Sequence, residues 1–314
     1  MKARVLILFA AAAGLLPPSI AIAQTNGQGQ AIVTVLPKHE GEIAPAVSQQ
    51  DLQSVKVNGK AVKVTSWSAL NRPQDAVELV LLIDDSARGS FGRQFQDIEQ
   101  FVRSLPPNVK AVIGYMQNGR AAISGALSAN HDEVLHALRL PIGSAGGNAS
   151  PYFCLSDLAK SWPSQDRAVR RDVIVVTDGV DNYNRRLDTD DPYVEAAIND
   201  AVRAGMTVYS IYWRSKGAFD ATLEGSNAGQ SLLAEVTQGT GGQSFAQGIG
   251  NPVSFAPYLD EVLRRLRNQY ELSFEAPAGN KPAVENLRIK LSVPGSQVTA
   301  PEKVLVIPSG SPAK

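Results

Sequence analysis

Length, composition and charge exclude several classes of protein. The chain has 314 residues, of which 44% are hydrophobic and 19% charged, so it has enough apolar material for a core and too much for a disordered chain. The 30 Lys and Arg cancel the 30 Asp and Glu, so bulk charge does not predict a nucleic-acid partner. With three His and one Cys, the chain has too few soft ligands for a closed zinc site and cannot form an internal disulfide.

Residues 1–23 have the features of an export signal. Two basic residues precede the apolar run Val5–Leu16, and Ala21-Ile22-Ala23 has the small-x-small pattern of a cleavage site. The run is too short to span a bilayer, so we expect cleavage before Gln24 and no stable membrane insertion afterwards; an uncleaved anchor is the alternative. An exported chain without disulfides is typical of a bacterial periplasmic or secreted protein.

Residues 24–30, rich in Gln and Gly, predict a linker, and residues 31–70 predict a small N-terminal β unit. Within this unit, Val55–Val64 is a hairpin signal, because Asn58-Gly59 supplies the two positive φ values of a tight type I′ turn. The unit is too small to fold alone and needs a partner.

Residues 75–268 predict an α/β domain. Apolar runs typical of strands buried on both faces occur at 77–83, 109–115, 172–177 and 207–212, with a shorter strand at 121–124. Helical periodicity alternates with them, at 91–105, 132–138, 154–162, 193–203, 230–237 and 257–266. This alternation predicts a doubly wound, mainly parallel sheet with helices on both faces.

Period two returns after residue 268, at 270–275, 287–293 and 304–307. These segments predict antiparallel strands with one polar face. We infer that residues 269–308 complete the N-terminal β unit, that the α/β domain is inserted between its halves, and that residues 309–314 form a tail.

Two of the buried strands end in acidic loops. One reads Asp84-Asp85-Ser86-Ala87-Arg88, and the other contains Asp178. Ligands of open α/β sheets bind beyond the carboxyl ends of the strands, so neighbouring strands would bring Asp84 and Asp178 together there. Two close carboxylates repel each other unless a cation, a proton or an Arg lies between them.

These motifs resemble those of the von Willebrand factor type A family, and most closely the bacterial secreted proteins with a related domain, a group first noted in acidobacteria. The family's metal-ion-dependent adhesion site uses Asp-x-Ser-x-Ser, a Thr from a later loop and an Asp after the fourth strand. Asp84-x-Ser86-x-Arg88, Gly146-Gly147-Asn148 and Asp178 match this pattern in part, and Leu266–Tyr270 resembles the strand that follows the domain in the bacterial group.

The resemblance implies an oxygen-only site for Mg²⁺ or Mn²⁺, formed by Asp84, Ser86, Asn148 and Asp178. Ser86 would be a direct ligand, the two aspartates would act through waters, and a carboxylate of the partner would complete the octahedron. In this chain Arg88 replaces one hydroxyl and Asn148 replaces the Thr. The charge balance favours a metal-free site in which Arg88 lies between the two aspartates, and the metal-loaded site stays open as the alternative.

The expected function is therefore protein binding, without catalysis, through the loops at the carboxyl ends of the strands. Residues expected to face the partner are Arg88, Asp181, Arg185 and Arg186. One alternative is a structural envelope component with a decayed site. Another is a hydrolase that uses Asp84 and Asp178 as an acid–base pair, for which the sequence offers no supporting nucleophile.

Overall fold

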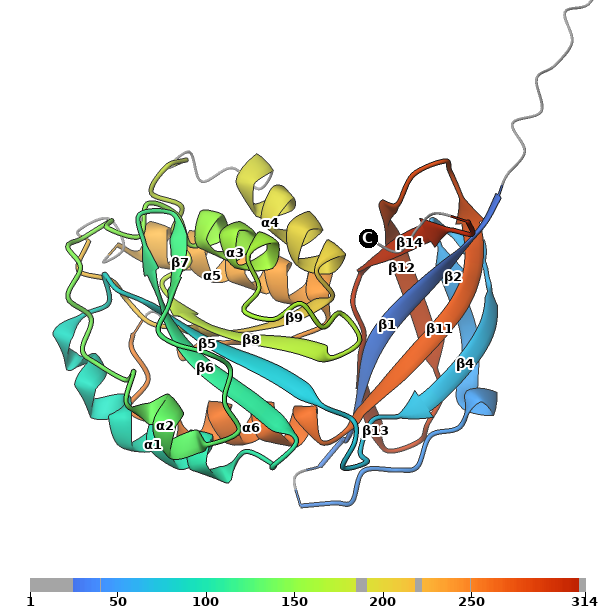
Figure 1. Cartoon of the computed structure of the whole chain (residues 1–314), viewed down its shortest axis with the longest axis horizontal. Helices are drawn as coiled ribbons and strands as arrows, with labels where there is room; N and C mark the ends of the chain where they lie inside the picture. Colours follow the sequence, from blue (N-terminus) through green and yellow to red (C-terminus); the bar gives the residue numbers. More distant parts are fainter. Residues whose placement is uncertain (1–24, 40, 185–190, 218–221, 249, 311–314) are drawn as a thin grey trace, which may run out of the picture.

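Two β-sheets organise the chain, one antiparallel and one mainly parallel (Figure 1). The computed structural model describes residues 25–39, 41–184, 191–217, 222–248 and 250–310. The predicted export signal, residues 1–23, lies outside these ranges, as do Arg185 and Arg186. In the part of the chain that is described, no helix has both the length and the apolar character needed to cross a membrane.

The antiparallel sheet takes its strands from both ends of the chain. Its spatial order is β3-β2-β12-β14-β1-β11-β4, with β13 paired to β1. The strands are β1 (Thr25–Pro37), β2 (Leu52–Val57), β3 (Lys60–Ala61), β4 (Lys63–Ala69), β11 (Gln269–Ala278), β12 (Ala283–Leu291), β13 (Ser296–Thr299) and β14 (Lys303–Pro308). A short 3₁₀ turn, η1 (Gln49–Asp51), precedes β2.

The sheet bends round on itself through one continuous segment, Lys60–Ala69. The start of this segment pairs with β2 and the remainder pairs with β11, which is at the other end of the strand order. The predicted hairpin that begins the segment is confirmed, with φ of 48° at Asn58 and 77° at Gly59. Closing a sheet in this way removes the exposed edges that would otherwise pair with other chains.

The predicted linker at residues 24–30 is wrong for Thr25–Gln30, which belong to β1 and pair with β11. The glycines that suggested a linker have a packing role, because a Cβ at Gly29 would lie 2.5 Å from Cζ of Phe274. Only a residue without a side chain lets the Phe274 ring lie against the backbone of β1.

The second sheet has the order β10-β9-β8-β5-β6-β7, in which β7 alone among the described pairs runs antiparallel to its neighbour. Its strands are β5 (Val77–Asp84), β6 (Val109–Gln117), β7 (Arg120–Ile123), β8 (Arg170–Thr177), β9 (Met206–Tyr212) and β10 (Ser244–Phe245). Every residue of β5 and β9 is buried, as expected for central strands covered on both faces.

Helices cover both faces of this sheet, as predicted (Figure 1). One face carries η2 (Gly89–Gln94), α1 (Phe95–Ser104), α2 (His131–Leu135) and α6 (Ala256–Leu266). The other face carries α3 (Pro151–Lys160), α4 (Pro192–Arg203) and α5 (Leu223–Thr240).

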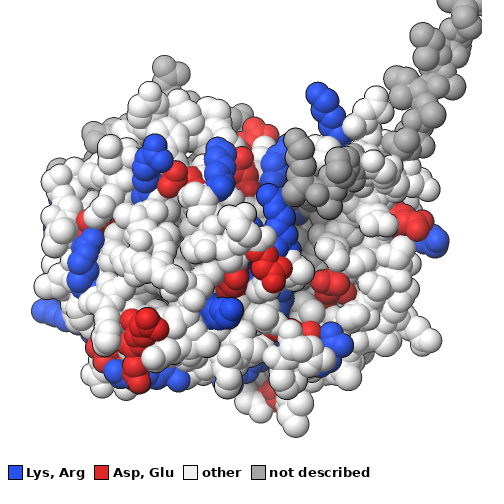
Figure 2. Space-filling model, in the orientation of Figure 1, with Lys and Arg blue, Asp and Glu red and all other residues white. Residues whose placement is uncertain are grey.

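The antiparallel sheet lies at the amino-terminal end of the parallel strands (Figure 1). Arg170, the first residue of β8, donates to the carbonyl oxygen of Leu266 at 3.4 Å, just before β11 begins. The loops at the carboxyl ends of the strands therefore lie on the side away from the antiparallel sheet. Figure 2 shows basic and acidic side chains interspersed with large uncharged areas on one face.

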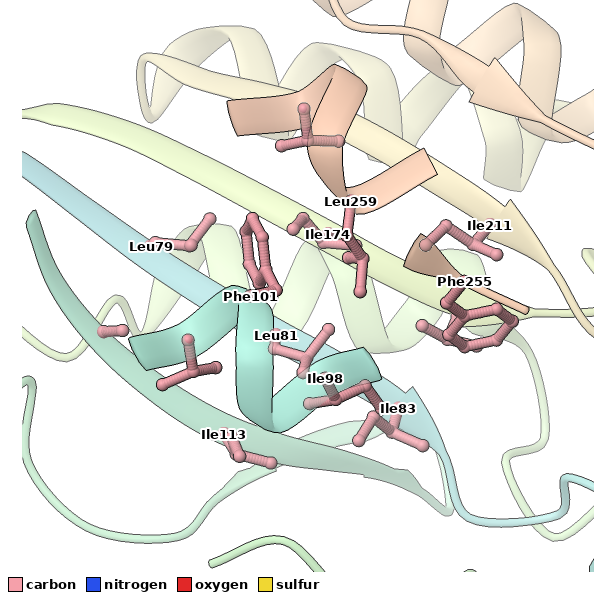
Figure 3. Packing of buried hydrophobic residues seen from close by; sticks show 14 of the residues in the cluster. Leu79, Leu81, Ile83, Ile98, Phe101, Ile113, Ile174, Ile211, Phe255 and Leu259 are labelled. Atoms are coloured by element: carbon pink, nitrogen blue, oxygen red, sulfur yellow. The ribbon is translucent and has the colours of Figure 1, made fainter. Parts of the chain in front are cut away.

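Two apolar layers fix the strands in place. In the layer of Figure 3, Leu79, Leu81 and Ile83 of β5 pack with Phe101 of α1 and Leu259 of α6. The residues between them on β5, Val80 and Leu82, face the opposite layer beneath α3, α4 and α5. Because both layers are filled, the carboxyl ends of β5 and β8 are held at fixed positions.

Candidate functional site

The two acidic loops lie next to each other, as the sequence predicts. Strands β5 and β8 are parallel neighbours, with Ile83 opposite Val176. Asp84 therefore lies opposite Thr177, one residue before Asp178. This adjacency places both aspartates at the carboxyl edge of the sheet, where ligands of α/β folds bind.

The carboxylate of Asp84 accepts four hydrogen bonds. Its Oδ1 accepts from the backbone N–H of Ser86 at 2.8 Å and from Ser86 Oγ at 2.6 Å. Its Oδ2 accepts from Asn148 Nδ2 and from Thr177 Oγ1, both at 2.8 Å. Together these donors use the acceptor capacity of the carboxylate, which ionised Asp offers on two oxygens.

The centre formed by these residues is sealed from solvent. Asp84 is 1% exposed, and Ser86, Asn148, Thr177 and Asp178 are 0% exposed. Burial raises the pKa of Asp84 above its ordinary value, although the hydrogen bonds from Ser86, Thr177 and Asn148 act in the opposite direction. The carboxylate is thus held by hydrogen bonds inside the protein and is not presented to a ligand.

Asp178 is positioned by its own turn and by α5. Its Oδ1 accepts from the backbone N–H of Val180 at 2.9 Å. A Cβ at Gly229 of α5 would lie 2.0 Å from the carbonyl oxygen of Asp178, so the helix approaches the loop through a residue without a side chain. On the other side, Tyr152 donates its hydroxyl to the carbonyl of Gly179 at 2.6 Å.

The structure places Arg88 elsewhere than between the two aspartates. Its Nε donates to the carbonyl oxygen of Ser215 at 2.8 Å, and within the described residues it forms no ion pair with Asp84 or Asp178. Its backbone precedes the 3₁₀ turn η2, and the neighbouring residue Ala87 forms a β-bridge with Ser215, which directs the Arg88 side chain toward that segment. The predicted guanidinium plug is replaced by the donors of Ser86, Asn148 and Thr177.

The Arg–Asp pair of this site is a different one, which the sequence did not reveal. Arg139 Nη1 lies 2.6 Å from Asp85 Oδ1, and its Nη2 lies 3.3 Å from Oδ2. The guanidinium also lies over the ring of Tyr115, 3.7 Å from its centroid. A separation of 54 residues leaves no local pattern that links Arg139 to Asp85.

Asp85 organises the loop after α2. Its Oδ1 accepts from the backbone N–H of Ile142 at 3.0 Å, and its Oδ2 accepts from Gln117 Nε2 at 2.7 Å. Burial by itself raises the pKa of Asp85, but the hydrogen bonds from Arg139, Gln117 and the Ile142 amide together lower it below the ordinary value. The ionised carboxylate therefore anchors Arg139 and Ile142 to the end of β5.

Asp181 is buried, contrary to the predicted partner-facing position. It is 2% exposed, and its Oδ1 accepts from the backbone N–H groups of Tyr183 at 2.7 Å and Asn184 at 3.2 Å. Burial raises its pKa above the ordinary value. Asp181 thus shapes the loop that presents Tyr183, which is 67% exposed. Asp side chains often accept hydrogen bonds from backbone N–H groups two or three residues later, so this turn is explained by the local sequence.

The residues do not fit a metal ion that a partner could reach. Ser86 is the one hydroxyl of the implied Asp-x-Ser-x-Ser pattern, and Asn148 directs Nδ2 to Asp84 while its Oδ1 accepts from Asn182 at 3.4 Å. Mg²⁺ keeps several waters in an octahedral shell, and the sealed centre offers no room for a partner's carboxylate in that shell.

Exposed apolar side chains lie on two loops that are hydrogen-bonded to Asp85 and Asp181, close in sequence to the sealed centre. Leu140 is 48% exposed and Ile142 is 74% exposed, on the loop anchored to Asp85. The next residue, Gly143, accepts through its carbonyl from Lys216 Nζ at 2.8 Å. We call Leu140, Ile142 and Tyr183 the apolar rim. Exposed apolar groups held on ordered loops are typical of protein-binding surfaces.

Comparisons with known proteins reveal only distant similarity. No family model matches the chain, and no curated protein matches it. Among solved structures, it is similar to an aerotolerance-related membrane protein from Bacteroides fragilis, with 14% identity, a TM-score of 0.40, and coverage of 61% of this chain and 98% of the other. It is similar to the manganese-loaded TRAP protein of Plasmodium vivax, with 13% identity, a TM-score of 0.42, and coverage of 76% and 96%. It is also similar to proximal thread matrix protein 1 from the mussel byssus, whose metal-ion-dependent adhesion site holds zinc, with 11% identity, a TM-score of 0.44, and coverage of 67% and 49%. Because these similarities are so distant, we assign no site residue and no partner of these proteins to this chain.

Proposed function

We propose that the chain is an exported protein-binding module of the von Willebrand A type that binds a partner protein through its carboxyl-edge loops without a bridging metal ion. The observation that carries the proposal is a sealed, hydrogen-bonded centre at Asp84 with the apolar rim anchored around it. The resemblance to bacterial secreted proteins with an α/β domain inserted in a β unit supports the exported location, together with the signal-like residues 1–23.

The hydrogen-bond donors around Asp84 stabilise its carboxylate, as a cation would in the metal site that the resemblance implies. A buried carboxylate needs compensation for its lost hydration, and four hydrogen bonds supply it here. A metal ion in the same place would replace the bond from Asn148 Nδ2 to Asp84, and the amide would have to turn away from Asn182 to offer its oxygen. The centre therefore serves to hold the loops in one shape, and affinity for a partner comes from the rim.

The rim favours a protein as the partner. Leu140, Ile142 and Tyr183 expose apolar surface, and apolar and aromatic side chains are the usual energetic anchors of protein interfaces. On the face drawn in Figure 2 basic and acidic side chains are interspersed, and the 30 basic residues of the chain are balanced by 30 acidic ones, so bulk charge gives no reason to prefer nucleic acid.

Catalysis by Asp84 and Asp178 receives no support from the geometry. A general acid must come within hydrogen-bond reach of a substrate, and Asp84 is 1% exposed with both oxygens occupied. The cleft between α5 and β13 and the cleft between α3 and α4 are lined by neither aspartate.

Site-specific photo-crosslinking tests the binding face. A photoreactive phenylalanine analogue replaces Ile142 on the rim, and in a matched variant it replaces Ile43, which is 94% exposed and lies on the connection between β1 and β2. We expect a discrete protein adduct from position 142 in the producing cells and none from position 43. Equal adducts from both positions, or none from position 142, would contradict the proposal and favour a structural role.

Thermal denaturation with added cations tests the metal-free centre separately. We expect the melting temperature to stay within about 1 °C of its starting value when millimolar Mg²⁺ or Mn²⁺ is added, since a ligand without a site does not stabilise the folded state. The same measurement is made on the double variant Arg88→Ser with Asn148→Thr, which restores the two hydroxyls that the implied metal site lacks in this chain. A rise of several degrees in the native chain would show that the centre binds metal.

A further inference from the structure

A second candidate surface lies on the side of the α/β unit and adjoins the apolar rim at Tyr183, which packs against two residues of its lining. It is a cleft of about 490 Å³ between α3, α4 and the turn that joins β6 to β7. Its lining includes Asn118, Arg120, Phe153, Asp157, Lys160 and Tyr193. The residues of α3 recur at helical spacing, so one face of this helix forms a wall of the cleft.

An aromatic cluster forms one end of the cleft. The ring centroids of Phe153 and Tyr193 lie 4.9 Å apart, and Tyr183 lies 5.3 Å from Phe153 and 5.5 Å from Tyr193. The rings meet at interplanar angles of 59° to 83°, and Phe153 and Tyr193 are half-buried. Tyr183 is 67% exposed, so a ligand can reach the cluster.

The two carboxylates that line the cleft, those of Asp157 and Asp200, already have partners in the protein. Asp157 accepts from Arg120 Nη1 at 3.3 Å and from the backbone N–H of Ala121 at 3.0 Å. Asp200 is paired with Lys160 Nζ at 2.7 Å. Both carboxylates are three-quarters buried, with side-chain exposures of 25% and 23%. A ligand that donates hydrogen bonds would therefore have to displace existing partners.

Donors in the same cleft are left over. Within the described ranges, the hydroxyl of Tyr193 and the side-chain amide of Asn118, which line the cleft, and the hydroxyl of Tyr183 beside it have no hydrogen-bond partner in the protein. Arg120 uses one nitrogen for Asp157 and its side chain is 79% exposed. The cleft thus favours a ligand that is rich in acceptors and poor in donors. An acidic segment is less suitable, because Arg120 and Lys160 already have carboxylate partners.

We propose that this cleft binds an extended, proline-rich segment of a partner protein. Proline has no backbone N–H, and a polyproline II segment turns its unpaired carbonyl oxygens outward, where tyrosine hydroxyls and amide groups bind them. Proline rings pack on aromatic faces in known grooves of this chemistry. From Phe153 to Lys160 the helix rises about 10 Å, which matches about three residues of polyproline II.

Titration with a synthetic peptide tests the proposal on the purified chain, independently of any partner of the rim. The probe is acetylated, amidated decaproline, followed by amide chemical shifts in nuclear magnetic resonance. We expect saturable shifts at residues 118–120, 153–160, 183 and 193–200. Glycine–serine and glutamate-rich peptides of equal length are the reference ligands, and we expect weaker binding of both.

Conservative variants test whether decaproline binds in the cleft. Tyr193→Phe and Tyr183→Phe keep the rings and remove one donor each, so each should weaken decaproline binding about 2- to 10-fold. Tyr258→Phe is the matched control, because Tyr258 is half-buried on α6 at the opposite face and stacks on Phe245. The proposal is wrong if decaproline shows no saturable shifts at millimolar concentration, if the glutamate-rich peptide binds more tightly, or if Tyr258→Phe weakens binding equally.

Discussion

Asn148 shows how a residue can be predicted in the right place with the wrong role. The resemblance placed it in the site with Asp84, and the structure brings the two side chains to 2.8 Å. The expectation was an amide oxygen for a metal, whereas the amide nitrogen faces Asp84. Sequence cannot decide which end of an amide faces a neighbour, because that depends on Asn182, whose Nδ2 donates to Asn148 Oδ1 from the loop after β8.

Removing the Asn148 amide should destabilise the fold. Asn148→Ala leaves Asp84 Oδ2 with one donor fewer in a sealed environment, and we expect a loss of about 1–3 kcal/mol in the free energy of unfolding. Asn280→Ala, at an exposed position between β11 and β12, is the control and should change stability by less than about 0.5 kcal/mol. Urea denaturation measures both. A loss in Asn148→Ala no larger than in the control would show that Asp84 does not depend on this bond.

Arg139 should matter more than an exposed arginine with similar partners. Arg139→Gln removes the guanidinium from Asp85, whose side chain is 5% exposed, and from the Tyr115 ring; we expect a loss of about 2 kcal/mol. Arg103→Gln, which breaks surface pairs with Glu99 and Asp132, should cost about 0–1 kcal/mol.

The Arg139 variant should also change the response to acid. The folded-state pKa of Asp85 is lowered, so its stabilising contribution is present above the ordinary pKa of Asp and is lost as pH falls through the lowered value. Without Arg139 that lowering shrinks, and acid unfolding should begin at a higher pH. Unfolding curves between pH 2 and pH 5 test this, and identical acid midpoints in both proteins would count against it.

At the scale of elements, periodicity predicted which segments are helices and strands better than where they end. The strands at 77–83 and 172–177 are confirmed, because long apolar runs have few alternatives to a buried strand. Helix α5 runs over Leu223–Thr240, well beyond the predicted 230–237. Its glycines at 225, 229 and 239 lower helical propensity, and tertiary packing overrides that local preference.

Gly229 is one of those glycines with a packing role at the site. Gly229→Ala is usually favourable in a helix, but here the new Cβ would meet the carbonyl oxygen of Asp178 at 2.0 Å. We expect a loss of about 1–3 kcal/mol as α5 moves away from the loop. Gly89→Ala, where nothing lies within 4 Å of the new Cβ, is the matched control. Equal stability of the two variants in thermal denaturation would show that the helix shifts without cost.

At the scale of the whole molecule, the pairing of the two chain ends in one antiparallel sheet follows from the period-two pattern on both sides of the α/β region. The contacts that join this sheet to the α/β unit could not be predicted. Arg170 donates to Gln269 Oε1, and Gln269 Nε2 donates to the hydroxyl of Tyr209 at 3.2 Å. These residues come from β8, β9 and β11, and nothing in their local sequences marks them as partners.

Asp172 is buried in this junction and should make the stability of the molecule depend on pH. It is 1% exposed, and its Oδ1 has no hydrogen-bond partner among the residues described. Burial raises its pKa to about 6, against the opposing effects of Arg170 and Gln269. Tyr209 on β9 and Arg265 on α6 share these surroundings. The neutral acid therefore suits the junction better than the carboxylate.

The sign of the effect follows from a folded-state pKa above that of the unfolded chain. The contribution of Asp172 is full below the unfolded value of 3.8 and is lost as pH rises through about 6, a change of about 3 kcal/mol for this group. Asp172→Asn keeps a neutral side chain at every pH, so it should be more stable than the native chain at pH 7.5 and close to it at pH 4. Asp260→Asn, at an exposed position of α6, is the control and should follow the native chain throughout. Urea denaturation from pH 4 to pH 8 measures the difference, and a constant gap between Asp172→Asn and the native chain across that range would refute the role of this carboxyl group.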